Sequence, residues 1–344
     1  MLDNFLEILI IILIITISIK GIKRNAHNNN IGEIQNNLNL LRGIVAIFII
    51  IGHCIMSYNS KIPIYLIPLS KLNTIFVGYF WVMSGYGLAW SVENKEKYIT
   101  YKQLIQKILY LCVTAFCVLT FSLVISGIED IVIKTGVWNS GVNWYLIVQS
   151  IFYICFFVTY KYFKDTKKAV VCVSAEILLF TIIALKFHFS RVYFISEWCF
   201  PVGLFLYEFK SIIKKGIENH HKKIFYVISV FVCISLYSFF TPDYTIQDLV
   251  FHNMFCIGVY LLLFYIFMFV KLENKIIRFL ARISFELYLY QFPVMAFLKS
   301  IYEKFEWKIG GLYLILVIVM TIIIASGMHI INRKIQNYIS LIRR

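Results

Sequence analysis

Residues 43–59, GIVAIFIIIGHCIMSYN, form an apolar run that starts directly after Arg42 and contains one basic side chain, His53. Its length is close to the roughly 20 residues with which an α-helix crosses the hydrocarbon core of a bilayer. Runs of this kind recur along the whole chain. The sequence therefore predicts an all-α fold, a polytopic transmembrane bundle of about 11 helices, over residues 3–19, 43–59, 72–91, 108–126, 143–160, 169–186, 192–209, 224–240, 250–270, 283–298 and 310–331.

Composition excludes a soluble globular protein. The 344 residues are 60% hydrophobic and 15% charged, with a mean hydropathy of +0.79, whereas soluble domains are about half apolar and about one quarter charged. The first run carries Asp3 and Glu7 at its start in place of Lys or Arg, and no small-residue cleavage site follows it. These features do not fit a signal peptide, so we expect residues 1–20 to form an extra N-terminal transmembrane helix.

The basic residues alternate along the chain. Of the 33 lysines and arginines, 25 follow the odd-numbered apolar runs. Because cytoplasmic loops carry the excess of Lys and Arg, we expect a multi-pass plasma-membrane protein with its N-terminus outside and its C-terminus in the cytoplasm. Loop anchors then account for the net charge of +15, so the expected partner is the lipid bilayer and not nucleic acid. The eight remaining cations are Lys61, Lys71, Lys134, Lys186, Arg191, Lys299, Lys304 and Lys308.

The eight cysteines lie in or beside apolar runs, without a CxxC pair and without the Cys/His spacing of a zinc site. We expect them to act as small packing residues, and we expect neither a disulfide framework nor a bound metal.

Arg42 and His53 lie on one face of the same predicted helix. They are eleven residues apart, which corresponds to a rise of about 16 Å and a rotation that returns to within about 20° of the same direction. We expect Arg42 at the cytoplasmic mouth of the helix and His53 near or beyond the bilayer middle. Ionisable residues inside a membrane are costly and mark functional sites. A topology anchor and a hydrogen-bonded packing histidine are the alternatives.

Three further stretches combine aromatic and polar residues. Residues 76–87 include Tyr79 and Ser84, and small residues in this stretch let neighbouring helices approach closely. Trp144 and Tyr145 start another run at the outer interface, where an aromatic belt is expected, and Gln149 lies deeper and needs a polar partner.

Residues 281–293 place two polar side chains, Glu286 and Gln291, inside an apolar run, where pairing with a basic residue of a neighbouring helix is the structural alternative. The predicted outer group of Arg191, Glu197 and Trp198 fits either acceptor binding or a surface ion pair.

These features, in this order, resemble the acyltransferase-3 family of membrane acyltransferases. Arg42 and His53, with ten residues between them, match its Arg–His signature. The similar segments are residues 80–86 (FWVMSGY), like its FFxxSG(F/Y) segment, residues 144–146 (WYL), like its W(F/Y)L segment, and residues 283–289 (ISFELYL), like its ISYxxYL segment. The resemblance covers about residues 40–300.

The resemblance implies a membrane acyltransferase domain over residues 21–344. It would transfer an acetyl group from cytoplasmic acetyl-CoA, a co-substrate and not a bound cofactor, to a hydroxyl of a sugar, a polysaccharide or a related acceptor. Arg42 would hold the phosphates of the nucleotide, and a neutral His53 would accept the proton of the attacking hydroxyl. The expected pocket residues are Ser84, Tyr79, Trp144, Tyr145, Gln149 and Glu197.

The chain departs from the family pattern at two positions. Many members have a carboxylate where Gln149 or Ser150 stands, and many have a histidine where Gln291 stands. We also expect no appended soluble hydrolase-like domain. A transporter or flippase is the alternative function, but we find no inverted repeat and only five prolines, whereas transporters often contain repeats with broken helices.

Overall fold

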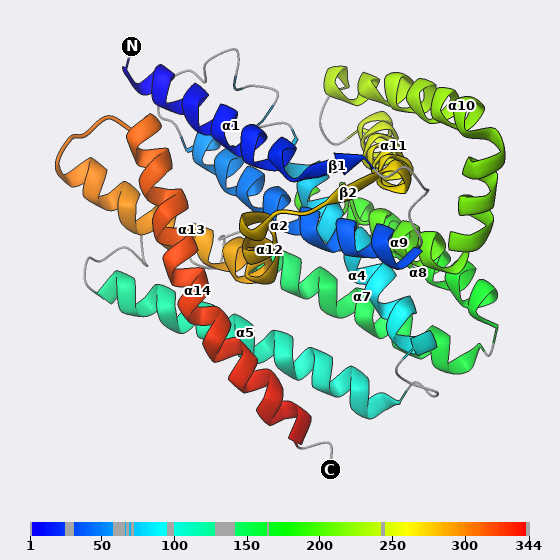
Figure 1. Ribbon diagram of the computed structural model, residues 1–344. Coiled ribbons are helices and arrows are strands. Elements are labelled where there is room, and N and C mark those ends of the chain that lie inside the picture. Colours follow the sequence, from blue (N-terminus) through cyan, green and yellow to red (C-terminus); the bar gives the residue numbers. More distant parts are fainter. Residues whose placement is uncertain are drawn as a thin grey trace.

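The computed structural model describes residues 2–24, 31–57, 66, 69, 72–94, 100–127, 142–163, 165–241 and 245–341. These residues form 12 α-helices (Figure 1). The helices are α1 (Leu2–Lys20), α2 (Ile31–Met56), α4 (Asn73–Asn94), α5 (Tyr101–Gly127), α7 (Val142–Tyr162), α8 (Thr166–Lys186), α9 (Cys199–Glu208), α10 (Lys210–Ser235), α11 (Ile246–Phe269), α12 (Lys275–Arg282), α13 (Ser284–Lys304) and α14 (Gly311–Leu341). Two 3₁₀ turns, η3 (Arg191–Tyr193) and η4 (Leu236–Phe240), and two short strands, β1 (Ile22–Arg24) and β2 (Val270–Leu272), complete the described elements.

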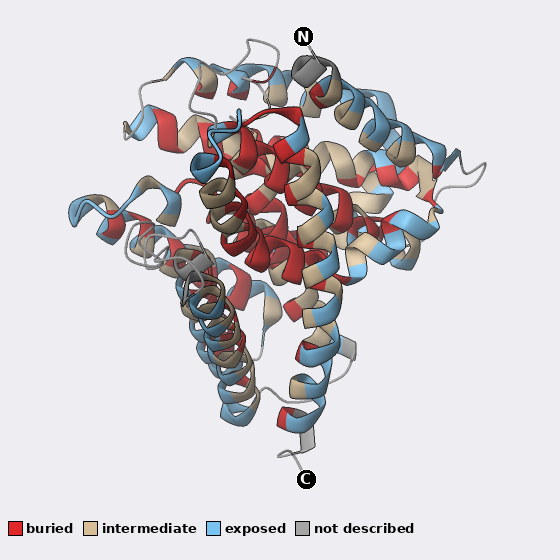
Figure 2. Cartoon of the chain, turned by 90° about the vertical axis from the view of Figure 1, so that its left-hand side faces the viewer, coloured by how far each residue is buried: buried red, intermediate tan, exposed pale blue. Residues whose placement is uncertain are grey.

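The molecule is a polytopic helical bundle, as the sequence predicts. Within the described residues, eight helices are long and apolar enough to cross a membrane. Large apolar side chains such as Phe116 on α5 and Ile323 on α14 are mostly exposed, which suits a surface that faces lipid. Figure 2 shows buried residues gathered in the middle of the bundle and exposed ones on the peripheral helices.

Helix α13 is enclosed by other helices and carries polar side chains within its buried length. It packs against α2, α5, α7 and α14, and its polar residues Glu286 and Gln291 are 3% and 0% exposed. A polar group inside a membrane bundle must find its partners in protein, so α13 positions two polar side chains between helices that come from distant parts of the sequence.

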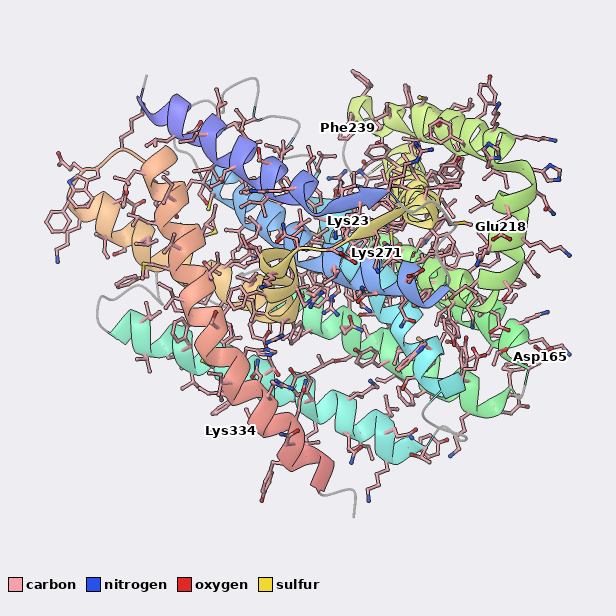
Figure 3. The ribbon with its side chains drawn as sticks, viewed as in Figure 1. Lys23, Asp165, Glu218, Phe239, Lys271 and Lys334 are labelled. Atoms are coloured by element: carbon pink, nitrogen blue, oxygen red, sulfur yellow. The ribbon has the colours of Figure 1, made fainter. Side chains whose placement is uncertain are left out.

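The alternating charges predict that connections after odd-numbered runs lie at one end of the bundle and those after even-numbered runs at the other. Contacts between connections agree with this grouping. Strands β1 and β2, which follow the first and ninth predicted runs, pair antiparallel, with Lys23 opposite Lys271 (Figure 3). Both lysines bind Glu273, at 2.6 and 3.0 Å, and hold the pKa of that exposed carboxyl down at about 2. At the other group of connections, Arg191 forms a bidentate ion pair with Asp248 (2.7 and 2.6 Å). Lys61, Lys71 and Lys134 lie outside the described residues.

The prediction of one membrane-spanning helix over residues 192–209 is wrong. The chain forms η3, then an irregular stretch, and becomes α-helical only in α9, which has 10 residues and a length of about 15 Å. The irregular residues Phe194, Ile195 and Glu197 are at most 2% exposed. Non-helical backbone is tolerated at membrane depth where protein surrounds it. The first half of the expected helix is therefore an irregular segment buried inside the bundle.

The predicted start of the second helix is also wrong. Helix α2 begins at Ile31, so Arg42 lies inside the helix, and His53 lies in its last turn. The polar stretch before Arg42 is helical because its apolar residues Ile34 and Leu38 are buried on one face. The side chain of Asn37 is buried against β2, where it donates to the carbonyl of Val270 (2.8 Å) and accepts from the amide of Leu272 (3.0 Å).

Helix α10 begins well before the eighth predicted run (residues 224–240). Residues 210–223, which were expected to form a connection, are helical as well. The helix turns at His220, where φ is −136° and ψ is 37°. The N-terminal helix α1 packs against α14, and Asn274, just before α12, donates to the carbonyl of Ile17 (2.9 Å).

Candidate active site

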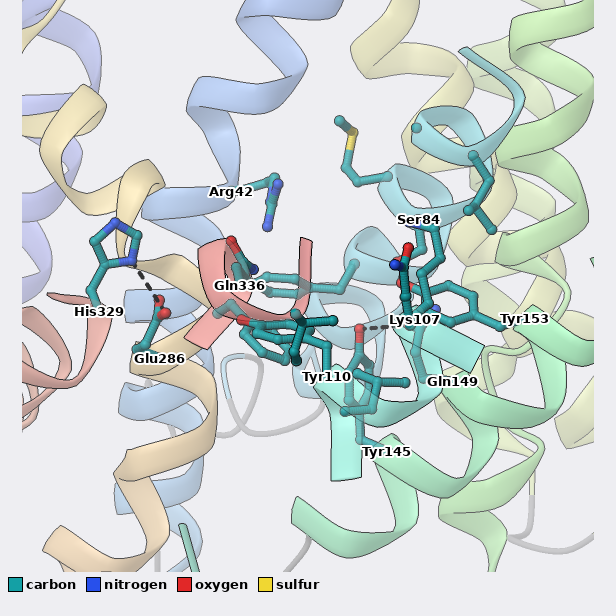
Figure 4. A pocket seen from close by; sticks show the side chains of 18 of the residues that line it. Arg42, Ser84, Lys107, Tyr110, Tyr145, Gln149, Tyr153, Glu286, His329 and Gln336 are labelled. Atoms are coloured by element: carbon teal, nitrogen blue, oxygen red, sulfur yellow. Dashed lines mark hydrogen bonds and ion pairs between the residues drawn. The ribbon is translucent and has the colours of Figure 1, made fainter. Parts of the chain in front are cut away.

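A cavity of about 570 Å³ lies among α2, α4, α5, α7, α12, α13 and α14 (Figure 4). Its walls include the first turns of α5 and the last turns of α14, with Gln103 and Ile339, the middle of α4, and Tyr145 in the first turn of α7. The start of α5 and the end of α14 adjoin connections of the lysine- and arginine-rich group. The volume lies within the range of small-molecule sites in proteins, about 300–1,000 Å³.

Three cationic side chains line this cavity: Arg42 of α2, Lys107 of α5 and Arg282 of α12. Gly43 explains how two arginines come together, because a Cβ at this position would lie 2.4 Å from the backbone nitrogen of Ala281. The missing side chain lets α12 lie directly on α2. Arg42, which precedes Gly43, and Arg282, which follows Ala281, are thereby brought to one cavity. Like charges that line one cavity repel one another, so an anion between them is favoured.

Buried nitrogen atoms around the cavity have no partner among the described residues. They are Nε of Arg42, Nε2 of Gln106, Nε2 of Gln149 and Nε2 of His329. Unpaired buried donors cost roughly 1–3 kcal/mol each, and a ligand that carries acceptor oxygens would satisfy them. The guanidinium of Arg42 also lies 5.9 Å from the ring centre of Phe80, and Nζ of Lys107 lies 5.5 Å from that of Tyr153.

A small polar network forms one wall of the cavity. The hydroxyl of Ser84 on α4 and that of Tyr145 on α7 both donate to Oε1 of Gln149, at 3.3 and 3.1 Å. The structure thus brings three of the predicted pocket residues together with Arg42. Ser84 joins two helices by this bond, and Gln149 has the polar partner that its position in an apolar helix requires.

Sequence reasoning missed His329, an imidazole that lines the cavity. His329 lies on α14, and its Nδ1 is 3.2 Å from Oε1 of Glu286 on α13 (Figure 4). The amide of Asn332, one turn further along α14, donates to the same oxygen at 3.0 Å. Glu286 therefore has the basic partner that its burial predicts. His329 falls inside the predicted run 310–331, and the rule applied to His53, an ionisable residue in a membrane helix, would have identified it.

His53 is not among the residues that line this cavity. It lies eleven residues beyond Arg42, which is about 16 Å along α2. Its Nδ1 is 3.0 Å from Oε1 of Gln291 on α13, and its ring packs against Phe292, with ring centres 4.7 Å apart. Helix α13 reaches both places: it contributes Glu286 to the cavity that Arg42 lines, and Gln291 to the contact with His53.

The other predicted pocket residues lie elsewhere in the bundle. The hydroxyl of Tyr79 donates to the carbonyl of Leu38 at 2.6 Å and so joins α4 to α2. Trp144 packs against Trp81 and Tyr193. Glu197 accepts from the hydroxyl of Thr181 on α8 at 2.7 Å. Arg191 pairs with Asp248.

The chain was compared with known proteins. A family model described as an acyltransferase domain, the acyltransferase-3 model, matches residues 35–329. No curated protein and no solved structure matches. The match covers Arg42, His53, Gln291, Glu286 and His329. The chain therefore belongs to the acyltransferase-3 family and is a polytopic membrane acyltransferase.

Proposed function

We propose that the chain is an O-acyltransferase of the plasma membrane. It transfers an acetyl group from cytoplasmic acetyl-CoA to a hydroxyl of a sugar, a polysaccharide or a related acceptor of the cell envelope. The observation that carries this proposal is the convergence of Arg42, Lys107 and Arg282 on one cavity, which reaches the end of the bundle where the basic connections gather.

The phosphates of acetyl-CoA bind in this cavity. Guanidinium groups bind phosphate oxygens through paired, charge-assisted hydrogen bonds, and the unpartnered nitrogens of Gln106 and Gln149 offer two further donors. The charge alternation puts this end of the bundle in the cytoplasm, with the N-terminus outside and the C-terminus inside. Acetyl-CoA is a cytoplasmic anion, so the cavity opens on the side that supplies the donor.

His53 is the general base. The flexible pantetheine arm extends from the cation cluster along α2 and α13 over the roughly 16 Å that separate Arg42 from His53. Since α2 starts at the cytoplasmic end and His53 lies in its last turn, the acceptor hydroxyl approaches from the outer side. The Ser84–Tyr145–Gln149 network lies beside the donor, and the other predicted pocket residues support the helices around it.

Removing Arg42 tests the donor site. Arg42→Ala is expected to weaken acetyl-CoA binding to the detergent-purified protein by about 1.5–3 kcal/mol, the usual contribution of a hydrogen bond to a charged group. This corresponds to a dissociation constant roughly 10 to 150 times higher. Isothermal titration calorimetry with acetyl-CoA measures it, and no knowledge of the acceptor is needed.

Arg278→Ala is the matched control, because Arg278 lies on α12 four residues before Arg282, is exposed and does not line the cavity. It removes the same charge and should leave binding nearly unchanged. Equal losses for both variants would mean that only the overall charge matters. If the native, folded protein binds no acetyl-CoA, the donor assignment is wrong and a transporter becomes the better hypothesis.

A further inference from the structure

The side-chain amide of Gln291 has a fixed orientation. Gln291 is fully buried, and its Nε2 donates to the backbone carbonyl of Tyr288 at 2.9 Å. A carbonyl oxygen can only accept a hydrogen bond, so the NH₂ end of the amide must face Tyr288. The other end, Oε1, therefore faces Nδ1 of His53 at 3.0 Å.

This orientation determines which nitrogen of His53 carries the hydrogen. Oε1 of an amide accepts and cannot donate, so Nδ1 of His53 must be protonated to form the bond. In the neutral ring Nε2 then keeps its lone pair. We propose that Gln291 is a positioning residue that holds His53 in the Nδ1–H tautomer and so makes Nε2 the proton acceptor. This proposal rests on the proposed function.

The ring is restrained from a second direction. Phe292, the next residue of α13, packs on His53 with an angle of 41° between the ring planes. Two neighbouring residues of one helix therefore hold the imidazole, one through its Nδ1–H and one through its face. Nε2 is the ring nitrogen that these contacts leave for a hydroxyl.

The reaction balances with a neutral orienting group. The acceptor oxygen bonds to the thioester carbonyl carbon, and its proton moves to Nε2 of His53. The C–S bond then breaks with its electron pair on the sulfur of CoA, and that sulfur takes the proton back from the imidazolium. Gln291 carries no charge, so it sets the tautomer without stabilising the imidazolium. A carboxylate at the same position would stabilise the charged ring.

The tautomer is measured directly by NMR of protein labelled with ¹⁵N-histidine, in detergent, at a pH where His53 is neutral. Its signals are assigned by their loss in His53→Gln. The native protein should show a protonated Nδ1 and an unprotonated Nε2. Gln291→Leu should lose that preference, whereas Gln291→Glu, which keeps an acceptor at this position, should retain it and increase the fraction of doubly protonated ring.

Kinetics provide the second readout. Gln291→Leu should lower kcat by up to the roughly 10²–10⁴-fold that a general base contributes and leave acetyl-CoA binding unchanged, because Gln291 does not line the donor cavity. Gln291→Asn, which keeps an amide but is too short to make both bonds, serves if the leucine variant does not fold. It should lose the tautomer preference too.

The two proposals fail in different ways. A native His53 with its hydrogen on Nε2, or a Gln291→Leu variant that keeps the Nδ1–H tautomer and the native kcat, overturns the role of Gln291. Failure of the native protein to bind acetyl-CoA overturns the donor assignment, and the NMR result is independent of that binding.

Discussion

Replacing His53 with glutamine is expected to lower the rate of acyl transfer by roughly 10²–10⁴-fold, the contribution of a well-placed general base. Glutamine can keep a polar contact with Gln291, but it cannot accept the proton of an attacking hydroxyl. Acetyl-CoA binding should be unchanged, because His53 lies about 16 Å along the helix from Arg42 and does not line the donor cavity. The measurement is incorporation of labelled acetyl groups from acetyl-CoA into membranes that contain the protein.

His221→Gln is the control for this experiment, since His221 is exposed on α10 and far along the chain from both sites. It should transfer acetyl groups at the native rate. A His53→Gln variant that also keeps the native rate would exclude His53 as the base. His329, held by Glu286 beside the cavity, would then be the next imidazole to test.

Replacing Gly203 with leucine is expected to prevent the bundle from folding. Helices α4 and α9 cross in direct backbone contact: a Cβ at Gly203 would lie 2.1 Å from the carbonyl oxygen of Val82, and one at Gly85 would lie 2.2 Å from that of Phe200. Backbone atoms cannot move aside as flexible side chains do. Overpacking of a tight core costs about 1–3 kcal/mol or more, and here the two helices would have to separate. Thermal unfolding and size-exclusion profiles in detergent measure the loss.

Gly327→Leu provides the comparison. Gly327 is also a glycine within a membrane helix, α14, but a Cβ at this position meets nothing within 4 Å. Its substitution should leave the unfolding temperature close to that of the native protein. Equal losses for Gly203→Leu and Gly327→Leu would show that the α4–α9 crossing has no special role.

Much of the fold could be predicted from local sequence. Each apolar run contains a helical segment, because a backbone in lipid must satisfy its own hydrogen bonds and a helix does so locally. The resemblance identified the correct family. The prediction of a full helix over residues 192–209 was wrong because a hydropathy pattern measures burial and does not distinguish burial in lipid from burial in protein. The start of α2 was missed for a related reason, since polar Asn37 is buried by pairing with β2.

The candidate site was only partly predictable. Arg42, Ser84, Tyr145 and Gln149 were expected together and line one cavity. Lys107 and Arg282 looked like ordinary loop anchors, and nothing local distinguishes a cation that lines a cavity from one that faces water. Gly43 next to Arg42 was the available signal, but its meaning depends on α12, which lies more than 200 residues later in the chain.

The sequence by itself determined the membrane class, the positions of most helices, the grouping of their connections and the two residues of the Arg–His signature. These properties depend on hydrophobicity, charge and spacing along one helix, which neighbouring residues specify. Only the tertiary structure decided that Arg42 shares a cavity with Lys107 and Arg282, that His53 does not line this cavity, and that Gln291 lies within hydrogen-bond distance of His53. Such contacts join side chains from helices distant in sequence, and their geometry is set by how those helices pack.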